Sequence, residues 1–286
     1  MIALRCGPTE LDVIPDRGGG IARFAWHDQD VFRPAVPGDD SPLALACFPL
    51  VPFSNRIARG TFTADGRDVR LPPNLPGGGH PHPLHGFGWQ ARWQVAQHRP
   101  DRAHLVHEHP TGVWPWRYRA EQTLQLGPDG YRHSLSLTNL GDTAMPAGLG
   151  LHPYFPKAEA RLTATFDGFW ETTADCLPVR WHPLGAMPDW FAGGSIDTVF
   201  TGRTGDLVID WPGRRLIMAA ADDLAFTVIY HPQGAPFFCV EPVSHMTDAI
   251  NRAEPPEATG LNWLRPGATW HTRIAFRMTD TQDGCL

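Results

Sequence analysis

Two ionisable residues, His152 and Glu241, each follow an apolar stretch and are each followed directly by a proline. A histidine can give or take a proton near neutral pH, and burial raises the pKa of a carboxyl group and makes it a better base. The prolines at 153 and 242 predict that each strand ends there, with the ionisable side chain at its last position. The two residues therefore predict an acid and a base that face one small cleft. The alternative for each is a structural role, as a strand-end histidine and a surface carboxylate.

Two other stretches carry polar groups that could line such a cleft. Asn55 and Arg56 follow an apolar segment, which is a usual way to bring a binding group to a rim. His80, His82 and His85 lie in an irregular loop rich in Gly and Pro, and their spacing resembles that of zinc ligands. Zinc sites usually draw ligands from different elements and need an ordered second shell, so we expect no metal here and a hydrogen-bonding role for His85.

The supply of aromatic residues fits a sugar ligand. The chain has 11 Trp, whose flat faces suit the apolar faces of pyranose rings, while Arg, Asn, His and Asp suit hydroxyl groups. Gly148 and Gly150, just before His152, predict bare backbone beside a cleft of sugar size. The chain has no nucleophile elbow, P-loop or dinucleotide fingerprint. A reaction that needs no cofactor is therefore the simplest prediction.

The elements that must position these residues are predicted to be strands. The 286 residues include 29 Gly and 29 Pro, and such frequent turn residues favour many short strands over long helices. Alternating patterns predict a hairpin over 2–14 and 20–33 and a second over 60–71, with its turn at Asp65-Gly66. Helical turns are expected only near 189–191 and 247–252. With no linker or repeat, we expect one all-β domain over 1–286, a large antiparallel β-sandwich or a barrel.

Further strands are predicted where alternating or apolar runs recur between turn signals. They are residues 93–97, 103–109, 118–126, 131–139, 207–211, 215–220, 225–230, 237–240 and 269–278.

The net charge and the cysteine content indicate which binding partners and which cellular compartment to expect. A net charge of −6 argues against a nucleic-acid partner, because binding phosphates needs a basic patch. No apolar run is long enough to cross a membrane, and the N-terminus does not resemble a signal peptide. The five dispersed Cys predict reduced, mostly buried thiols and a cytoplasmic location. The oligomeric state is left open.

Taken together in order, the motifs resemble the aldose 1-epimerase (galactose mutarotase-like) family. Each motif is weak alone, but the ordered set is specific and covers most of the chain. The matching segments are Phe53-Ser54-Asn55-Arg56-Ile57, Leu84-His85-Gly86, Gly150-Leu151-His152-Pro153-Tyr154-Phe155, Ile196-Asp197-Thr198-Val199-Phe200 and Val240-Glu241-Pro242.

The resemblance implies a large β-sandwich and the interconversion of the α and β anomers of a free aldose. By position, His152 is then the acid that protonates the ring oxygen, and Glu241 is the base that takes the proton from the C1 hydroxyl. The resemblance also implies that Arg56 and His85 bind the sugar near C1 and that Asp197 accepts bonds from its hydroxyls. Asn55 is expected to shape the turn at Arg56.

Three other functions remain open. A hexose-phosphate mutarotase would need clustered cations, and Arg214-Arg215 is the only adjacent basic pair. A non-catalytic carbohydrate-binding protein would have little reason to keep both His152 and Glu241. A metal-dependent sugar isomerase or lyase would have to use the histidines of the loop before residue 88.

Overall fold

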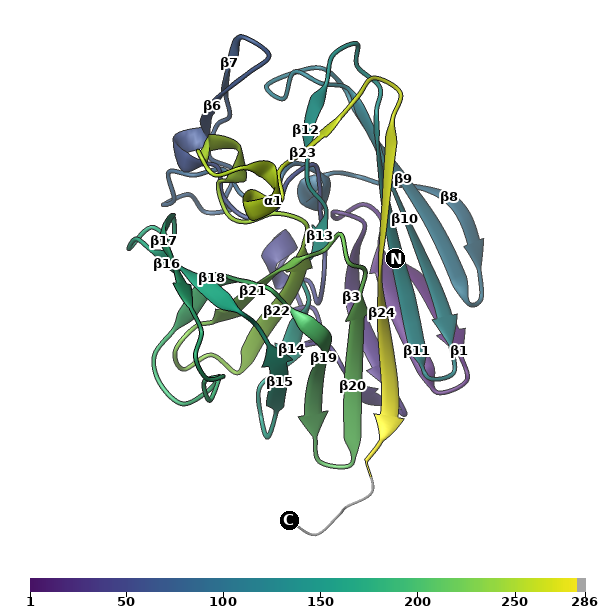
Figure 1. The fold of residues 1–286 in the computed structure, drawn as a ribbon. Coiled ribbons are helices and arrows are strands. Elements are labelled where there is room, and N and C mark those ends of the chain that lie inside the picture. Colours follow the sequence, from purple (N-terminus) through teal and green to yellow (C-terminus); the bar gives the residue numbers. More distant parts are fainter. Residues whose placement is uncertain (282–286) are drawn as a thin grey trace.

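A computed structural model describes residues 1–281 and confirms the all-β sandwich. Two eight-stranded sheets provide most of the architecture, and every strand pair within them is antiparallel. Figure 1 shows the long strands of the first sheet on one side and the shorter strands of the second sheet beside them.

We call the first the long-strand sheet. In spatial order its strands are β15 (Arg161–Thr165), β19 (Thr204–Trp211), β20 (Arg214–Ala220), β24 (Thr269–Asp280), β11 (Gly130–Asn139), β10 (Tyr118–Gly127), β9 (Arg102–His109) and β8 (Gln94–Arg99).

We call the second the short-strand sheet. Its strands are β17 (Pro178–Pro183), β16 (Gly168–Thr172), β18 (Ile196–Thr201), β21 (Phe226–His231), β22 (Phe237–Val243), β13 (Gly150–Leu151) and β5 (Pro49–Leu50), with β14 (Tyr154–Pro156) also paired to β22.

Smaller elements complete the described chain. A four-stranded sheet comprises β1 (Ile2–Cys6), β2 (Thr9–Ile14), β3 (Gly20–Trp26) and β4 (Gln29–Asp30). Two-stranded ribbons pair β6 (Thr61–Ala64) with β7 (Arg67–Arg70) and β12 (Met145–Ala147) with β23 (Asn262–Leu264). The helical turns are η1 (Pro42–Ala44), η2 (Ala58–Gly60), η3 (Gly88–Gln90), η4 (Ala249–Asn251) and α1 (Pro256–Thr259).

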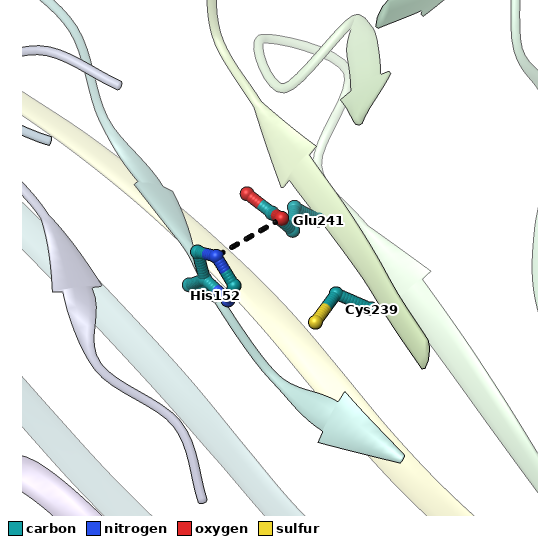
Figure 2. A group of neighbouring side chains, drawn as sticks. All are labelled: His152, Cys239 and Glu241. Carbon is teal, nitrogen blue, oxygen red and sulfur yellow. Dashed lines mark ion pairs between the residues drawn. The ribbon is translucent and has the colours of Figure 1, made fainter. Parts of the chain in front are cut away.

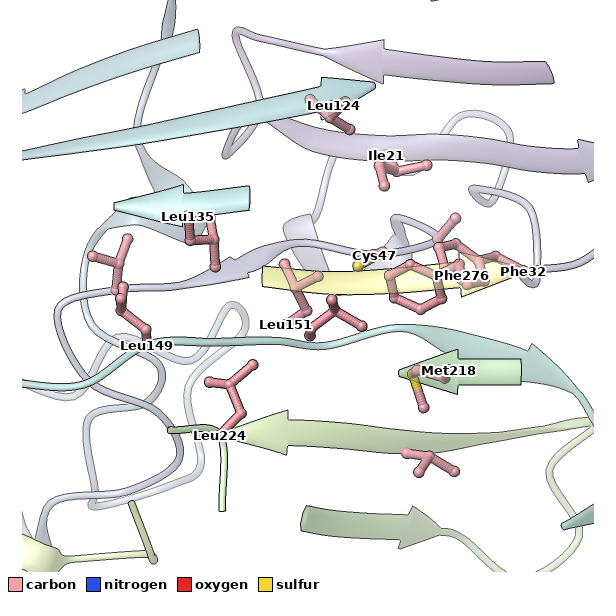
Figure 3. Packing of buried hydrophobic residues seen from close by; sticks show 14 of the residues in the cluster. Ile21, Phe32, Cys47, Leu124, Leu135, Leu149, Leu151, Met218, Leu224 and Phe276 are labelled. Atoms are coloured by element: carbon pink, nitrogen blue, oxygen red, sulfur yellow. The ribbon is translucent and has the colours of Figure 1, made fainter. Parts of the chain in front are cut away.

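The core follows from the period-two pattern of the strands. In β10, every second residue from Tyr118 is buried, so one face of the long-strand sheet is apolar. Leu124 of β10 and Phe276 of β24 belong to the same buried cluster as Leu149 and Leu151, which lead into the short-strand sheet (Figure 3). Burial of apolar side chains of this size contributes roughly 1.5–3 kcal/mol each.

Most predicted strands are confirmed, and several local predictions need correction. The hairpin at 60–71 forms with Asp65 and Gly66 at positive φ, as its turn requires. Residues 2–14 do not form one arm of a hairpin, because β1 and β2 already pair with each other and β2 then pairs with β3.

The predicted helical turn near 247–252 is present as η4, whereas 189–191 forms no helix. Trp190 there is buried against Phe166 and Phe200, so packing of an aromatic ring decides this segment.

The prediction that Pro242 ends a strand was wrong. β22 continues through Pro242 to Val243, so Glu241 lies inside a strand. Ser244 N–H donates to Leu149 O, and alternation turns the missing N–H of Pro242 toward the same neighbour. In the register that pairs Gly150 with Val243, Pro242 lies opposite Leu151, the last residue of β13, at the end of the short pairing between β13 and β22. The strand is interrupted at His152 and Pro153 and then resumes as β14, so the chain does not turn away there.

The two glycines before His152 also have a different role from the one predicted. A Cβ at Gly148 would lie 2.2 Å from the His245 ring, and one at Gly150 would lie 2.7 Å from Val243 Cγ1. They allow close packing within the protein rather than approach of a sugar.

Within the described residues, no helix is both long and apolar enough to cross a membrane. Four cysteines carry free thiols, namely Cys6, Cys47, Cys176 and Cys239, of which the second and fourth are buried. Cys285 lies outside the described residues.

Candidate active site

The register of the short-strand sheet brings His152 and Glu241 together. On either side of the gap in the strand, Gly150 pairs with Val243 and Tyr154 pairs with Cys239. The same register carried across the gap sets His152 directly opposite Glu241, at the spacing where cross-strand side chains interact. His152 Nε2 lies 3.2 Å from Glu241 Oε1, and Figure 2 shows the two side chains pointing toward each other.

Burial acts in opposite directions on the two groups. The exposed fractions are 5% for His152 and 2% for Glu241. Desolvation lowers the pKa of His152 to about 3, and it raises the pKa of Glu241 well above its ordinary value, with the charge of Asp197 as a further cause. The pair therefore holds one proton from about pH 3 up to the raised pKa of Glu241.

Aromatic rings surround the imidazole of His152. The rings of Phe48 and Tyr154 each have their centroids 4.7 Å from it, and the His85 ring meets it edge-on at 5.2 Å. Nδ1 of His152 is buried and finds no hydrogen-bond partner among the described residues. Packing rather than hydrogen bonding thus holds this ring, which leaves Nε2 to face the carboxyl group of Glu241.

Arg56 is held from three directions. Asn55 Oδ1 accepts hydrogen bonds from the backbone N–H of Arg56 and from Nη1, both at 2.9 Å. Nη2 of Arg56 lies 3.1 Å from Asp197 Oδ2, and Nε donates to His80 Nε2 at 3.4 Å. Asn55 adopts φ 54°, a region that Asn tolerates better than most residues, and this agrees with its predicted role in the turn.

The hydrogen bonds of His85 define its tautomer. Its Nδ1 accepts the backbone N–H of Asn55 at 3.1 Å, and its own backbone N–H donates to Asn55 O. Burial lowers the pKa of His85 well below its ordinary value, with the charges of His152 and Arg56 as lesser causes. A neutral imidazole that accepts at Nδ1 carries its proton on Nε2, so His85 presents an N–H donor.

The histidines of the 72–88 loop do not form a shared metal site. His82 is buried, with Nε2 lying 2.9 Å from Asp175 Oδ2 and Nδ1 accepting the N–H of Arg59. His85 Nδ1 is used as described, and His80 bonds Arg56. The three imidazoles serve separate partners, and His82 ties the loop to the turn that carries Asp175.

All six residues selected from the sequence line one cavity of about 400 Å³. Its walls comprise Asn55, Arg56, His85, His152, Asp197 and Glu241, together with Arg33, Leu43, Leu75, His80, Leu84, Tyr154, Val228, Tyr230 and Phe237.

No Trp lines this cavity, so the high Trp content, which suggested flat faces for a sugar, does not supply its walls. Trp114, Trp116 and Trp190 are buried in the core, and Trp181 is 42% exposed on β17. The aromatic walls are instead Tyr154, Tyr230 and Phe237. Tyr154 lies two residues from His152, so period-two alternation would have placed it on the same face.

Arg33 is the one basic wall residue that the sequence gave no reason to select. Its guanidinium lies 4.0 Å from the centroid of the Tyr154 ring and 5.0 Å from that of Phe237. Nη2 donates to Leu43 O and Leu45 O, and no carboxylate pairs with this side chain in the part of the chain that the structure describes. The cavity wall therefore carries two guanidinium groups, and of these only that of Arg56 pairs with a carboxylate among the described residues.

The fold and this cavity define an antiparallel β-sandwich with a buried, facing histidine and glutamate on the wall of one pocket. The sequence model of the aldose 1-epimerase family matches residues 4–277. The chain therefore belongs to the aldose 1-epimerase family, as its motifs indicated.

Individual relatives agree with this family. The uncharacterized protein YphB of Escherichia coli K12 is 33% identical over 296 aligned residues, which cover 95% of this chain and 96% of YphB. A crystal structure of an Escherichia coli K12 protein, provisionally described as an aldose 1-epimerase, is 31% identical with a TM-score of 0.87 and covers 98% of both chains. A galactose mutarotase-like protein from Clostridium acetobutylicum shares the fold at 18% identity, with a TM-score of 0.88 over 98% of this chain and 95% of that one.

Proposed function

We propose that the protein interconverts the α and β anomers of a free aldose, with His152 as general acid and Glu241 as general base. The observation that carries this proposal is the facing pair, 3.2 Å apart, on the wall of a cavity at the small end of the roughly 300–1,000 Å³ typical of ligand sites. Mutarotation needs one proton given and one proton taken at adjacent oxygens, which is the chemistry that such a pair supplies.

The proposed reaction leaves the proton count of the pair unchanged. His152 gives a proton to the ring oxygen while Glu241 takes the proton of the C1 hydroxyl, and the bond between C1 and the ring oxygen breaks. The open-chain aldehyde then rotates about C1–C2. On closure the former ring oxygen attacks the other face of C1, its proton returns to His152, and Glu241 returns a proton to the C1 oxygen.

The resting position of the proton adds a step. Because burial lowers the pKa of His152 and raises that of Glu241, the proton rests on the carboxyl group when the cavity holds no sugar. We infer that the C1 hydroxyl, by hydrogen-bonding to the carboxylate of Glu241, favours transfer of this proton to His152. The donor and acceptor are already close enough for the transfer.

Two further groups are suited to hold the sugar. His85 offers its Nε2–H as a neutral donor to an oxygen near C1, because its Nδ1 is already used. Arg56 and Asp197 form a charged pair that can donate to and accept from sugar hydroxyls. Asn55 acts on the substrate through Arg56, because its Oδ1 is already occupied by two N–H groups.

Polarimetry on freshly dissolved α-glucose and α-galactose tests the proposal. Wild-type protein is expected to speed relaxation of the optical rotation, and Glu241→Gln is expected to be slower by about 10²–10⁴-fold. Sugar affinity by calorimetry with no acceleration by wild type would instead indicate a non-catalytic carbohydrate-binding protein.

One observation favours a second candidate, a mutarotase for a phosphorylated hexose. The guanidinium of Arg33 lies on the cavity wall and pairs with no carboxylate among the described residues, so it could pair with a phosphate dianion. The pair selected for this role from the sequence lies elsewhere: Arg214 donates to Asp30 O and Arg215 bonds Asp210, both on the long-strand sheet. Comparing kcat/KM on glucose and glucose 6-phosphate for wild type and Arg33→Met separates the two substrates.

A further inference from the structure

A third side chain with metal-ligand chemistry lies beside the facing pair. Cys239 and Glu241 are two residues apart on β22, so their side chains share one face of the short-strand sheet, the face from which His152 also projects. One ligand atom from each of Cys239, Glu241 and His152 lies within 4.8 Å of the other two (Figure 2). Among residues 1–281 this is the one group of three such side chains close enough to hold an ion.

We propose that Cys239, His152 and Glu241 form a three-ligand site for Zn²⁺, and that bound Zn²⁺ excludes the sugar. The thiolate, imidazole and carboxylate set suits Zn²⁺, whereas Mg²⁺ and Ca²⁺ prefer oxygen ligands throughout. Three protein ligands leave a fourth position, and that position faces the cavity because His152 and Glu241 line it.

The charges at the site balance when the ion is bound. Coordination needs the thiolate of Cys239, the carboxylate of Glu241 and a free nitrogen on His152. Two protons therefore leave, one from the thiol and one shared by the facing pair, and the two negative ligands offset the charge of Zn²⁺. This neutrality matters because Cys239 is fully buried and an uncompensated charge there would be costly.

Bound Zn²⁺ is expected to inhibit anomer exchange, and a higher sugar concentration is expected to relieve this inhibition. Zn²⁺ would engage both members of the proton-transferring pair, so the ion and the sugar could not occupy the site together. This consequence rests on the proposed function, whereas binding of the ion does not.

Cobalt serves as a spectroscopic probe because Co²⁺ bound through a thiolate has a charge-transfer band in the near ultraviolet. Wild-type protein titrated with Co²⁺ is expected to show this band at one ion per chain, and Zn²⁺ is expected to abolish it. Cys239→Ser is expected to lose the band and to bind Zn²⁺ at least about tenfold more weakly, the lower end of what losing even an outer-shell partner costs.

Cys176→Ser is the matched control, because this half-buried thiol also lies near the cavity, beside Asp197, but outside the group of three. It is expected to behave as wild type. Glu241→Gln keeps the thiol and loses a ligand, so it is expected to keep a weakened band, and it provides a second variant if Cys239→Ser does not fold.

A wild-type protein without the band, or a band that survives in Cys239→Ser, would overturn the metal site. Stoichiometric Co²⁺ binding with no competition by sugar would overturn its inhibitory role. A band that depends on Cys239 in a protein with no effect on any anomer exchange would leave the metal site standing and refute the proposed function.

Discussion

Removing the side chain of Asn55 tests how the cavity positions its cation. Asn55→Gly deletes Oδ1, which accepts two hydrogen bonds from Arg56, one from its backbone and one from its guanidinium. A hydrogen bond to a charged group contributes about 1.5–3 kcal/mol. If that energy is fully used to hold Arg56 in the transition state, its loss lowers kcat/KM by about 10- to 150-fold, at 1.36 kcal/mol per tenfold change.

Asn55→Ala separates this effect from backbone strain. At φ 54°, Ala costs roughly 1–2 kcal/mol, which outweighs the roughly 0.5–1 kcal/mol entropic cost of Gly. Asn55→Ala is therefore expected to unfold in urea about 1 kcal/mol more easily than Asn55→Gly. Both variants are expected to lose kcat/KM equally in the polarimetric assay. Wild-type kcat/KM in Asn55→Gly would refute the reasoning, because Arg56 would then need no anchor.

Three further outcomes are expected. The rate of anomer exchange should be constant through pH 6.5, where a free histidine titrates, because the pair holds one proton there. It should fall on the alkaline side as pH rises through the raised pKa of Glu241, and on the acid side only near pH 3. A decline on acidification near pH 6.5 would contradict the one-proton pair. Gly150→Ala should lower the free energy of unfolding in urea by about 1–3 kcal/mol through overpacking, whereas Gly194→Ala, with open space around it, should not. Hydrogen bonds from Thr173 and then from His82 lower the pKa of Asp175 to about 2. The stability that Asp175 adds over Asp175→Asn should therefore be complete above its unfolded pKa and should vanish as pH falls through about 2. Equal unfolding midpoints of the two proteins at neutral pH would show that these hydrogen bonds add no stability.

The sequence identified the cavity residues better than it explained their positions. His152 and Glu241 were selected because each follows an apolar run and precedes a proline, and the structure brings them together. Glu241 was expected to end a strand because a proline follows it, and this was incorrect. β22 continues through Pro242, which lies at the end of the short pairing with β13. Sheet register sets the two residues opposite each other, and register depends on pairing between segments far apart in the chain.

Long-range contacts also account for what the sequence did not predict. Arg33 reaches the cavity because its backbone N–H donates to Tyr154 O, a contact across 121 positions that no local pattern shows. The partner of His82 is Asp175, which is 93 positions away in the sequence. The Trp content suggested flat faces for a sugar from composition alone, which does not say where any one Trp lies; Trp114 and Trp190 fill the core.

The most direct test of the central claim is a double-mutant cycle on the facing pair. His152→Gln and Glu241→Gln, singly and together, are assayed for exchange between α- and β-glucose and between α- and β-galactose by magnetization-transfer NMR. If the two groups act as one proton-transferring unit, each single variant loses about 10²–10⁴-fold and the double variant loses little more than either one. Losses that multiply in the double variant, or a single variant as fast as wild type, would contradict the account.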